Sequence, residues 1–188
     1  MYDKIYCINL DHRTDRWEET KEELAKMGWE AERYSALPSF NHTMQAIMKR
    51  IRKNKSSLIL EDDVEFRDAA HLAKALTELP DTWDLFSLGA TVNRTHKEKQ
   101  GTYVWRYYDG WATHAVAYSK RLVNWIADNF DPECGMIYDE WLRLEVLPKF
   151  NCYIVKPFIA YQRPSFSDIR NRYADYTKGF EESENKLV

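Results

Sequence analysis

Three acidic residues, Glu61, Asp62 and Asp63, directly follow the short apolar run at 57–60. Two carboxylates about 4 Å apart repel each other by about 4 kcal/mol at an effective dielectric of 20. A divalent cation converts that repulsion into attraction, and Mg²⁺ and Mn²⁺ prefer such oxygen ligands. If the backbone remains extended, Glu61 and Asp63 share one face and Asp62 points away. The pattern predicts a cation site; the alternative is a solvated acidic turn leading into the next helix.

Two arginines, Arg13 and Arg16, stand at the start of an expected helix in the segment CINLDHRTDRW. The helix dipole disfavours cations at this end by a few tenths of a kcal/mol or more. A bound phosphate would remove the conflict, because helix N-termini and arginines both bind anions. The alternative is that the two arginines pair with the neighbouring acids Asp11 and Asp15.

A second acidic pair, Asp139 and Glu140, opens another expected helix and is flanked by apolar residues. Acids are ordinary first-turn residues, but a base that takes a hydroxyl proton must be a positioned carboxylate or histidine. His114 lies among small apolar residues and is expected to be a hydrogen-bonded core residue. The sequence contains neither GxGxxG nor GxxxxGK[ST], so the common dinucleotide and phosphate loops are absent.

Short apolar strands alternate with amphipathic helices along the chain. We expect strands at 4–10, 29–34, 57–60, 83–88, 103–108, 111–118 and 152–155, and helices at 17–27, 44–51, 72–79, 119–130 and 137–147. This alternation predicts one α/β domain with a mostly parallel central sheet flanked by helices, plus an antiparallel part from a hairpin turning at Asp109 and Gly110. Ligands bind such sheets at the carboxyl ends of strands, where Glu61 stands. We expect the domain to span residues 1–169, followed by a polar C-terminal tail at 170–188 that frays at its end.

Composition excludes several classes of protein. A chain of 188 residues with 44% hydrophobic residues buries a proper core, and a net charge of −3 gives no basic excess for nucleic acid. No apolar run approaches the roughly 20 residues of a membrane span. The start lacks the pattern of a secretory signal, and three scattered cysteines suit a reducing compartment, so we expect a cytoplasmic location. Aromatic residues make up 14% of the chain; Trp105, Tyr107, Tyr108 and Trp111 are candidates for stacking on sugars, although we expect most to fill the core.

Taken in chain order, several segments resemble glycosyltransferase family 25, the lipopolysaccharide and collagen-type galactosyltransferase group. The matching segments are INLDHRTDRW, FNHTMQAI, LILEDDVEF, WDLFSLG, THAVAYSKR, YDEWL and residues 162–169. His42 matches the family's second segment, whereas Asn41 stands where serine is usual. The resemblance implies a GT-A-type fold and inverting, metal-dependent transfer of galactose or a related hexose from a UDP-sugar to an acceptor hydroxyl.

The resemblance also implies roles for individual residues. Glu61 and Asp63 would flank Mn²⁺ or Mg²⁺, and Asp139, with Glu140 as second choice, would be the base near the acceptor. The residues implied to bind the UDP-sugar donor are Asn9, Leu10, Asp11, Arg13, Arg16, Asp62, Gln162, Ser167 and Asp168.

One departure and two alternatives remain. The stretch between Tyr34 and His42 is shorter than in the family, which affects the acceptor side most. The first alternative is an inactive, shortened relative that binds nucleotide sugar or glycan. The second is a metal-dependent phosphodiesterase, although such an enzyme normally needs more metal ligands and a basic groove. Expected partners are the donor and a glycan or other hydroxyl-bearing acceptor. No membrane span is expected, although a lipid-linked acceptor would bring the protein to a membrane surface.

Overall fold

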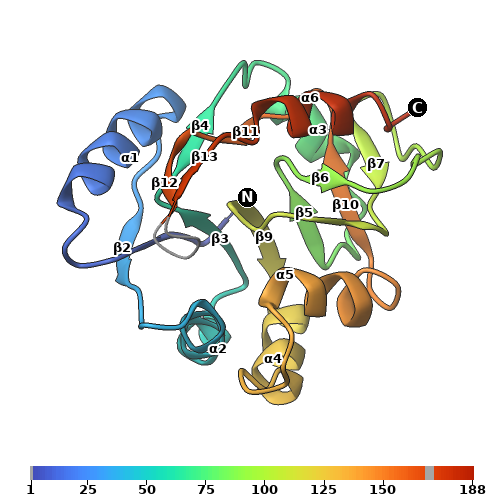
Figure 1. Cartoon of the computed structure of the whole chain (residues 1–188). Helices are drawn as coiled ribbons and strands as arrows, with labels where there is room; N and C mark the ends of the chain where they lie inside the picture. Colours follow the sequence, from blue (N-terminus) through green and yellow to red (C-terminus); the bar gives the residue numbers. More distant parts are fainter. Residues whose placement is uncertain (1, 168–171) are drawn as a thin grey trace.

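The computed structural model describes residues 2–167 and 172–188 and is built around a seven-stranded sheet (Figure 1). In spatial order the strands are β2 (Glu32–Ser35), β1 (Lys4–Asn9), β3 (Ser56–Glu61), β9 (Ala115–Ser119), β5 (Leu85–Ser87), β10 (Cys152–Val155) and β7 (Val104–Arg106). Strands β2, β1, β3, β5 and β10 run in one direction, whereas β9 and β7 run against their neighbours. The predicted α/β domain with a mostly parallel sheet and an antiparallel part is therefore confirmed.

The antiparallel part does not come from the predicted hairpin. Strand β9 lies between β3 and β5, while β7 pairs with β10 at the sheet edge. Asp109 does not sit in an exposed turn: its buried carboxylate accepts hydrogen bonds from Arg94 Nε at 2.9 Å and Arg143 Nη1 at 3.1 Å. These two ion pairs hold the chain between β7 and β9 against the domain, so the two strands separate instead of pairing.

Three small two-stranded sheets complete the strand structure. They pair β4 (Val64–Phe66) with β11 (Ala160–Gln162), β6 (Thr91–Val92) with β8 (Gly110–Trp111), and β12 (Ser165–Ser167) with β13 (Arg172–Ala174). All three pairs are antiparallel. They carry the chain across the end of the large sheet at which β1 and β3 finish.

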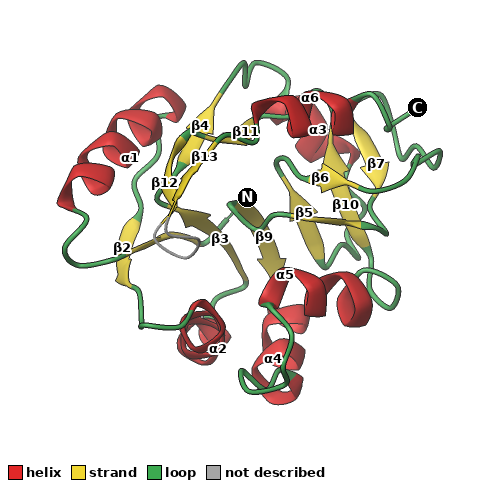
Figure 2. Ribbon diagram, viewed as in Figure 1, coloured by secondary structure: helices red, strands yellow, loops and turns green. Residues whose placement is uncertain are grey.

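Helices cover both faces of the large sheet. They are α1 (Thr14–Met27), α2 (Phe40–Arg50), α3 (Leu72–Glu78), α4 (Lys120–Asn129), α5 (Tyr138–Trp141) and α6 (Thr177–Glu184), with a 3₁₀ turn at Ile51–Lys53 and a π-helical turn at Leu142–Val146. Helices α2 and α4, which lie together below the sheet in Figure 2, share one hydrophobic cluster with α5 and α6. Helices α1 and α3 contribute to a second cluster. Within the part of the chain that the structure describes, no helix combines the length and apolar composition needed to cross a bilayer.

Two predicted helix boundaries are confirmed. Helix α1 stops at Gly28, whose φ of +64° is the left-handed conformation that glycine adopts easily. Helix α4 begins after Ser119, whose Oγ accepts a hydrogen bond from the backbone N–H of Leu122 at 3.2 Å.

The C-terminal segment differs from the expected polar tail. Helix α6 places Phe180 in the core without exposed surface, against the rings of His114 and Tyr161. Leu187, near the end expected to fray, is also fully buried. Tyr173 and Val188 remain exposed, at 68% and 51%, but burial of Phe180 and Leu187 shows that the segment packs as part of the domain.

Truncating Phe180 tests how strongly α6 stabilises the domain. Phe180→Ala is expected to lower the free energy of unfolding by about 3–5 kcal/mol, because it empties a fully buried aromatic site. The measurement is urea denaturation followed by circular dichroism. Lys178→Ala, whose side chain on the same helix is 89% exposed, is the control and should stay within about 0.5 kcal/mol of wild type. Equal stability of both variants would mean that α6 is a dispensable tail.

Candidate active site

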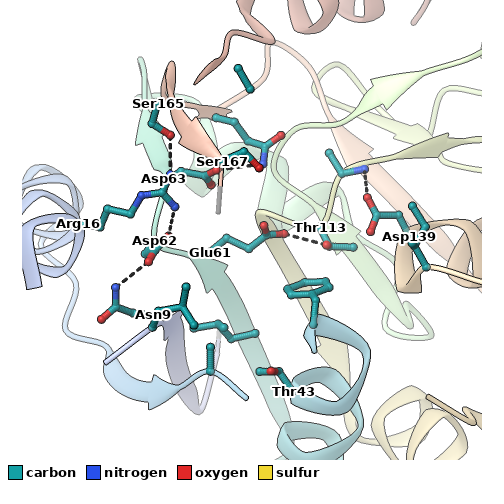
Figure 3. Close-up of a pocket in the computed structure, with 18 of the residues that line it drawn as sticks. Asn9, Arg16, Thr43, Glu61, Asp62, Asp63, Thr113, Asp139, Ser165 and Ser167 are labelled. Atoms are coloured by element: carbon teal, nitrogen blue, oxygen red, sulfur yellow. Dashed lines mark hydrogen bonds and ion pairs between the residues drawn. The ribbon is translucent and has the colours of Figure 1, made fainter. Parts of the chain in front are cut away.

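A cavity of about 840 Å³ opens at the carboxyl ends of β1 and β3 (Figure 3). Its walls come from the ends of these strands, the turn after β3, the segment between β8 and β9, α5 and the chain after β11. The predicted site residues that line it are Asn9, Leu10, Arg16, Glu61, Asp62, Asp63, Asp139, Gln162 and Ser167. Asp11, Arg13 and Glu140 are not among the lining residues, and Asp168 lies outside the described residues.

The three consecutive carboxylates face three different directions. Strand β3 ends at Glu61 and the next two residues form a turn, so the expected extended backbone does not continue through Asp63. Glu61 Oε1 accepts a hydrogen bond from Thr113 Oγ1 at 2.9 Å, and Gln162 Nε2 lies 3.4 Å from Asp63 Oδ2. Figure 3 shows Glu61 directed toward Thr113, and Asp62 toward the opposite wall. The acids therefore reach the cavity from a turn, each with its own partner.

Asp62 is neutralised within the protein. Its carboxylate accepts hydrogen bonds from Asn9 Nδ2 at 2.6 Å and Arg16 Nη1 at 2.7 Å, and the Arg16 and Asp62 side chains are each only 10% exposed. The other end of the Arg16 guanidinium, Nη2, donates to Ser165 Oγ at 2.7 Å and to the carbonyl oxygen of Phe166 at 2.8 Å. The buried pair thus joins α1, the turn after β3 and β12, and Arg16 lines the cavity with two of its nitrogens already engaged by the protein.

Asp11 and Arg13, the other two charged residues predicted to bind the donor from the segment 7–17, lie outside the cavity. Arg13 forms an ion pair with Asp15 at 3.0 Å, which holds the pKa of Asp15 at about 2. Asp11 is exposed, accepts a hydrogen bond from Ser35 Oγ at 2.7 Å and lies 3.6 Å from Arg33. Pairing with neighbouring acids, the alternative considered for the two arginines, therefore describes Arg13 and not Arg16.

The cavity carries an excess of negative charge at Glu61 and Asp63. Burial, followed by repulsion from Asp63 and Asp139, raises the pKa of Glu61 well above its ordinary value. Burial and then repulsion from Asp62 raise the pKa of Asp63 to about 6. Asp63 Oδ1 is buried, and it has no hydrogen-bond partner among the described residues. Arg16 and Arg163 offset part of this effect on the pKa of Asp63, and a cation beside Oδ1 would offset it further.

The ligand set fits a cation that arrives together with phosphate groups. Among residues 2–167 and 172–188, no three histidine, cysteine or acidic side chains are grouped closely enough to enclose a metal by themselves. Mg²⁺ sites commonly use one or two carboxylates and complete their coordination with substrate phosphates and water. Glu61 and the open oxygen of Asp63 fit this second kind of site.

The raised pKa of Asp63 predicts a pH dependence of stability and of metal binding. A carboxyl whose pKa rises from 3.8 to about 6 on folding stabilises the folded state below pH 3.8, and this contribution is lost as the pH rises through 6. A cation must displace the proton, so binding strengthens over the same range. We expect Mn²⁺ with UDP to raise the melting temperature more at pH 7.5 than at pH 5, measured by differential scanning fluorimetry. Equal shifts at both pH values would exclude Asp63 as the titrating ligand.

Asp139 and Glu140 are consecutive residues of α5, but their carboxylates have different partners. Asp139 lines the cavity, and its Oδ2 accepts a hydrogen bond from the backbone N–H of Ala112 at 3.3 Å. Glu140 instead accepts from Trp111 Nε1 at 2.7 Å and from Arg143 Nη2 at 2.6 Å. Hydrogen bonds from Arg143 and then Trp111 lower the pKa of Glu140 to about 2. Of this pair, only Asp139 is placed to meet a ligand in the cavity.

The expectation for His114 is confirmed, whereas the expectation that most of the four aromatic residues fill the core holds only for Trp105 and Tyr107, since Tyr108 and Trp111 are partly exposed. His114 is fully buried, its Nε2 lies 3.1 Å from the carbonyl oxygen of Ala160, and burial lowers its pKa to about 4. Trp105 and Tyr107 are buried in or against the core, whereas Trp111 is only partly buried and lines the cavity.

Three cavity residues were not singled out from the sequence. Thr113 holds Glu61, and Ser165 accepts from Arg16. Arg163 Nη2 reaches both Glu19, at 2.6 Å, and the carbonyl oxygen of Asp62, at 3.2 Å. A signal for Thr113 was available, since it immediately precedes the predicted core histidine. No local pattern distinguishes Arg163 or Ser165 from ordinary loop residues.

Comparison with known proteins finds likeness at the level of structure. No family model matches the sequence, and no curated protein matches it. The crystal structure of A197 from STIV superposes with a TM-score of 0.54 at 10% identity, covering 92% of this chain and 94% of that one. A glycosyltransferase involved in the glycosylation of the major capsid of PBCV-1 superposes with a TM-score of 0.51 at 12% identity, covering 98% and 90%.

The fold is GT-A-like. The two superpositions cover 92% and 98% of this chain. At identities of 10% and 12% the likeness concerns the fold, so the roles of individual residues must be argued from this chain's own geometry.

Proposed function

We propose that this protein is a glycosyltransferase, a short relative of family 25. It would transfer galactose or a related hexose from a UDP-sugar to an acceptor hydroxyl with inversion. The observation that carries this proposal is the buried Oδ1 of Asp63, which has no hydrogen-bond partner within residues 2–167 and 172–188. It lies near Glu61 in a cavity whose opposite wall holds Asp139. The cavity volume of about 840 Å³ falls in the range of sites for small organic ligands, about 300–1,000 Å³.

Glu61 and Asp63 would hold the Mn²⁺ or Mg²⁺ that accompanies the donor. The bound cation would stabilise the negative charge that develops on the departing diphosphate. Neighbouring side chains hold both carboxylates: Thr113 orients Glu61, and Gln162 lies against one oxygen of Asp63. Arg16 neutralises Asp62, which limits the charge left for the cation to balance.

Asp139 would accept the proton of the acceptor hydroxyl as that oxygen attacks the anomeric carbon. The Ala112 N–H holds one of its oxygens. Glu140 is the poorer candidate, because its carboxylate is occupied by Trp111 and Arg143, which lower its pKa to about 2. General bases placed in this way contribute about 10²–10⁴-fold to a rate.

The acceptor would enter along the wall formed by the chain before α2 and the start of α5. Leu37, Phe40 and Ile137 line this side, and Leu37 and Ile137 are 43% and 65% exposed. An apolar border suits the nonpolar face of a sugar ring. A lipid-linked glycan acceptor would bring the protein to a membrane surface without a span.

A thermal-shift screen of nucleotide sugars with and without Mn²⁺ tests the proposal, because a ligand that binds only the folded state raises the melting temperature. A UDP-release assay with candidate acceptors follows. A Mn²⁺-dependent shift with UDP-sugars and release of UDP would support the enzyme. Binding without release would identify a nucleotide-sugar-binding module, and hydrolysis of bis-nitrophenyl phosphate without UDP binding would identify a phosphodiesterase.

A further inference from the structure

Three consecutive residues contact three carboxylates, two of which line the cavity. Trp111 Nε1 donates to Glu140 Oε2 at 2.7 Å, and the backbone N–H of Ala112 donates to Asp139 Oδ2 at 3.3 Å. Thr113 Oγ1 donates to Glu61 Oε1 at 2.9 Å. The acids belong to different elements, because Glu61 ends β3 while the other two belong to α5. The segment 111–113 therefore connects the two sides of the cavity by hydrogen bonds.

The middle residue of this segment has an unusual backbone. Ala112 has a φ of +79°, and the other described residues with positive φ are the glycines Gly28 and Gly135. A residue with a Cβ adopts this region only where its surroundings impose it, and such residues gather at functional sites. The chain turns here between β8 and β9, and the turn sends the Ala112 N–H and the Thr113 hydroxyl to acids on different elements. Figure 3 shows Thr113 between Glu61 and Asp139.

Charge repulsion acts on the distance between Glu61 and Asp139. Their charges repel, and this repulsion contributes to the raised pKa of Glu61. Two carboxylates on different elements would separate under this repulsion unless neutral donors restrained them. The segment 111–113 supplies one donor to each.

We propose that the segment 111–113 is a positioning element that fixes the separation of Glu61 from Asp139. In the proposed reaction this separation sets the distance between the diphosphate and the attacking hydroxyl. The chemical consequence rests on the proposed function, whereas the geometric claim does not. Thr113 and Ala112 are positioning residues that act through the two carboxylates.

Thr113→Val tests the hydroxyl, because it keeps the shape of the side chain and removes the donor. We expect kcat to fall about 10–100-fold, the usual loss when the partner that orients a metal-binding or catalytic side chain is removed. Thr113→Ser should recover most of this loss. Thr77→Val, which removes an exposed hydroxyl on α3 outside the cavity, is the matched control and should keep wild-type kcat. Crystal structures of wild type and Thr113→Val should differ in the Glu61–Asp139 separation by about 0.5 Å or more.

Ala112→Gly separates positioning from stability. Glycine accepts positive φ, so the melting temperature should stay the same or rise. The more flexible backbone should at the same time position the N–H donor at residue 112 less precisely against Asp139, and kcat should therefore fall. A loss of activity without a loss of stability is a result that a purely structural residue would not give.

An unchanged Glu61–Asp139 separation in Thr113→Val would overturn the proposal, and so would wild-type kcat in either Thr113→Val or Ala112→Gly. A parallel fall of melting temperature and kcat in Ala112→Gly would also overturn it, since it would mark an ordinary structural role. If the wild-type protein transfers no sugar, the proposed function fails, and the crystallographic comparison alone then decides the positioning claim.

Discussion

Asp63→Asn will remove the Mn²⁺-dependent part of UDP binding. Asparagine keeps the shape of the side chain but replaces the carboxylate, whose Oδ1 has no hydrogen-bond partner in the described part of the chain, with a neutral amide. We expect UDP affinity in the presence of Mn²⁺ to fall by at least about 100-fold, since loss of a mere orienting partner already costs about 10–100-fold. Affinity without metal should change little. Isothermal titration calorimetry with UDP, in Mn²⁺ and in chelator, measures both quantities.

The same variant carries its own check on folding. Because the pKa of Asp63 is raised to about 6, its charge is unfavourable in the metal-free protein at pH 7.5, and Asp63→Asn should be at least as stable as wild type. Asp81→Asn changes an exposed aspartate outside the cavity and is the matched control. Metal-dependent UDP binding that survives in Asp63→Asn would show that the acidic turn does not hold the cation.

Asp139→Asn should reduce turnover by about 10²–10⁴-fold while leaving donor binding within about twofold of wild type. The reason is that the amide cannot accept the acceptor's proton, although it can keep the hydrogen bond from Ala112. Steady-state UDP release gives turnover, and calorimetry with UDP and Mn²⁺ gives binding.

Two further variants sharpen this experiment. Glu140→Gln should have a much smaller effect, because its carboxylate faces Trp111 and Arg143 and does not line the cavity. Glu145→Gln, which alters a carboxylate paired with Lys149 on the following turn, controls for a change of charge near α5. Unchanged turnover in Asp139→Asn, or donor binding lost together with turnover, would reject Asp139 as the base.

Local sequence patterns were sufficient for the elements on which the site is built. The apolar run before Glu61 forms β3, and the three- and four-residue spacing of Met44, Ile47 and Met48 places them on the buried face of α2. Such patterns depend on which residues must leave water, and that requirement is the same whatever the rest of the chain does. The acidic turn was found for the same reason, since charges directly after a buried strand are conspicuous.

Contacts between residues far apart in the sequence could not be predicted from such local patterns. Asp62 pairs with Arg16, which lies 46 residues earlier, and no local pattern in the sequence indicates this contact. The direction of β9 was equally hidden, because alternating hydrophobicity is the same for a strand that runs either way. Since β9 runs against β3, its beginning and not its end lies at the cavity, which explains why Thr113 escaped a search of strand ends.

The order of the walls along the chain has a consequence for biosynthesis. Gln162, which covers Asp63, follows it by 99 residues. At about 5–20 residues per second, a ribosome adds that length in about 5–20 s. Throughout this interval the acidic turn has been synthesised but Gln162 has not. A polypeptide released before β11 and β12 are made would lack the wall of the cavity that these strands supply.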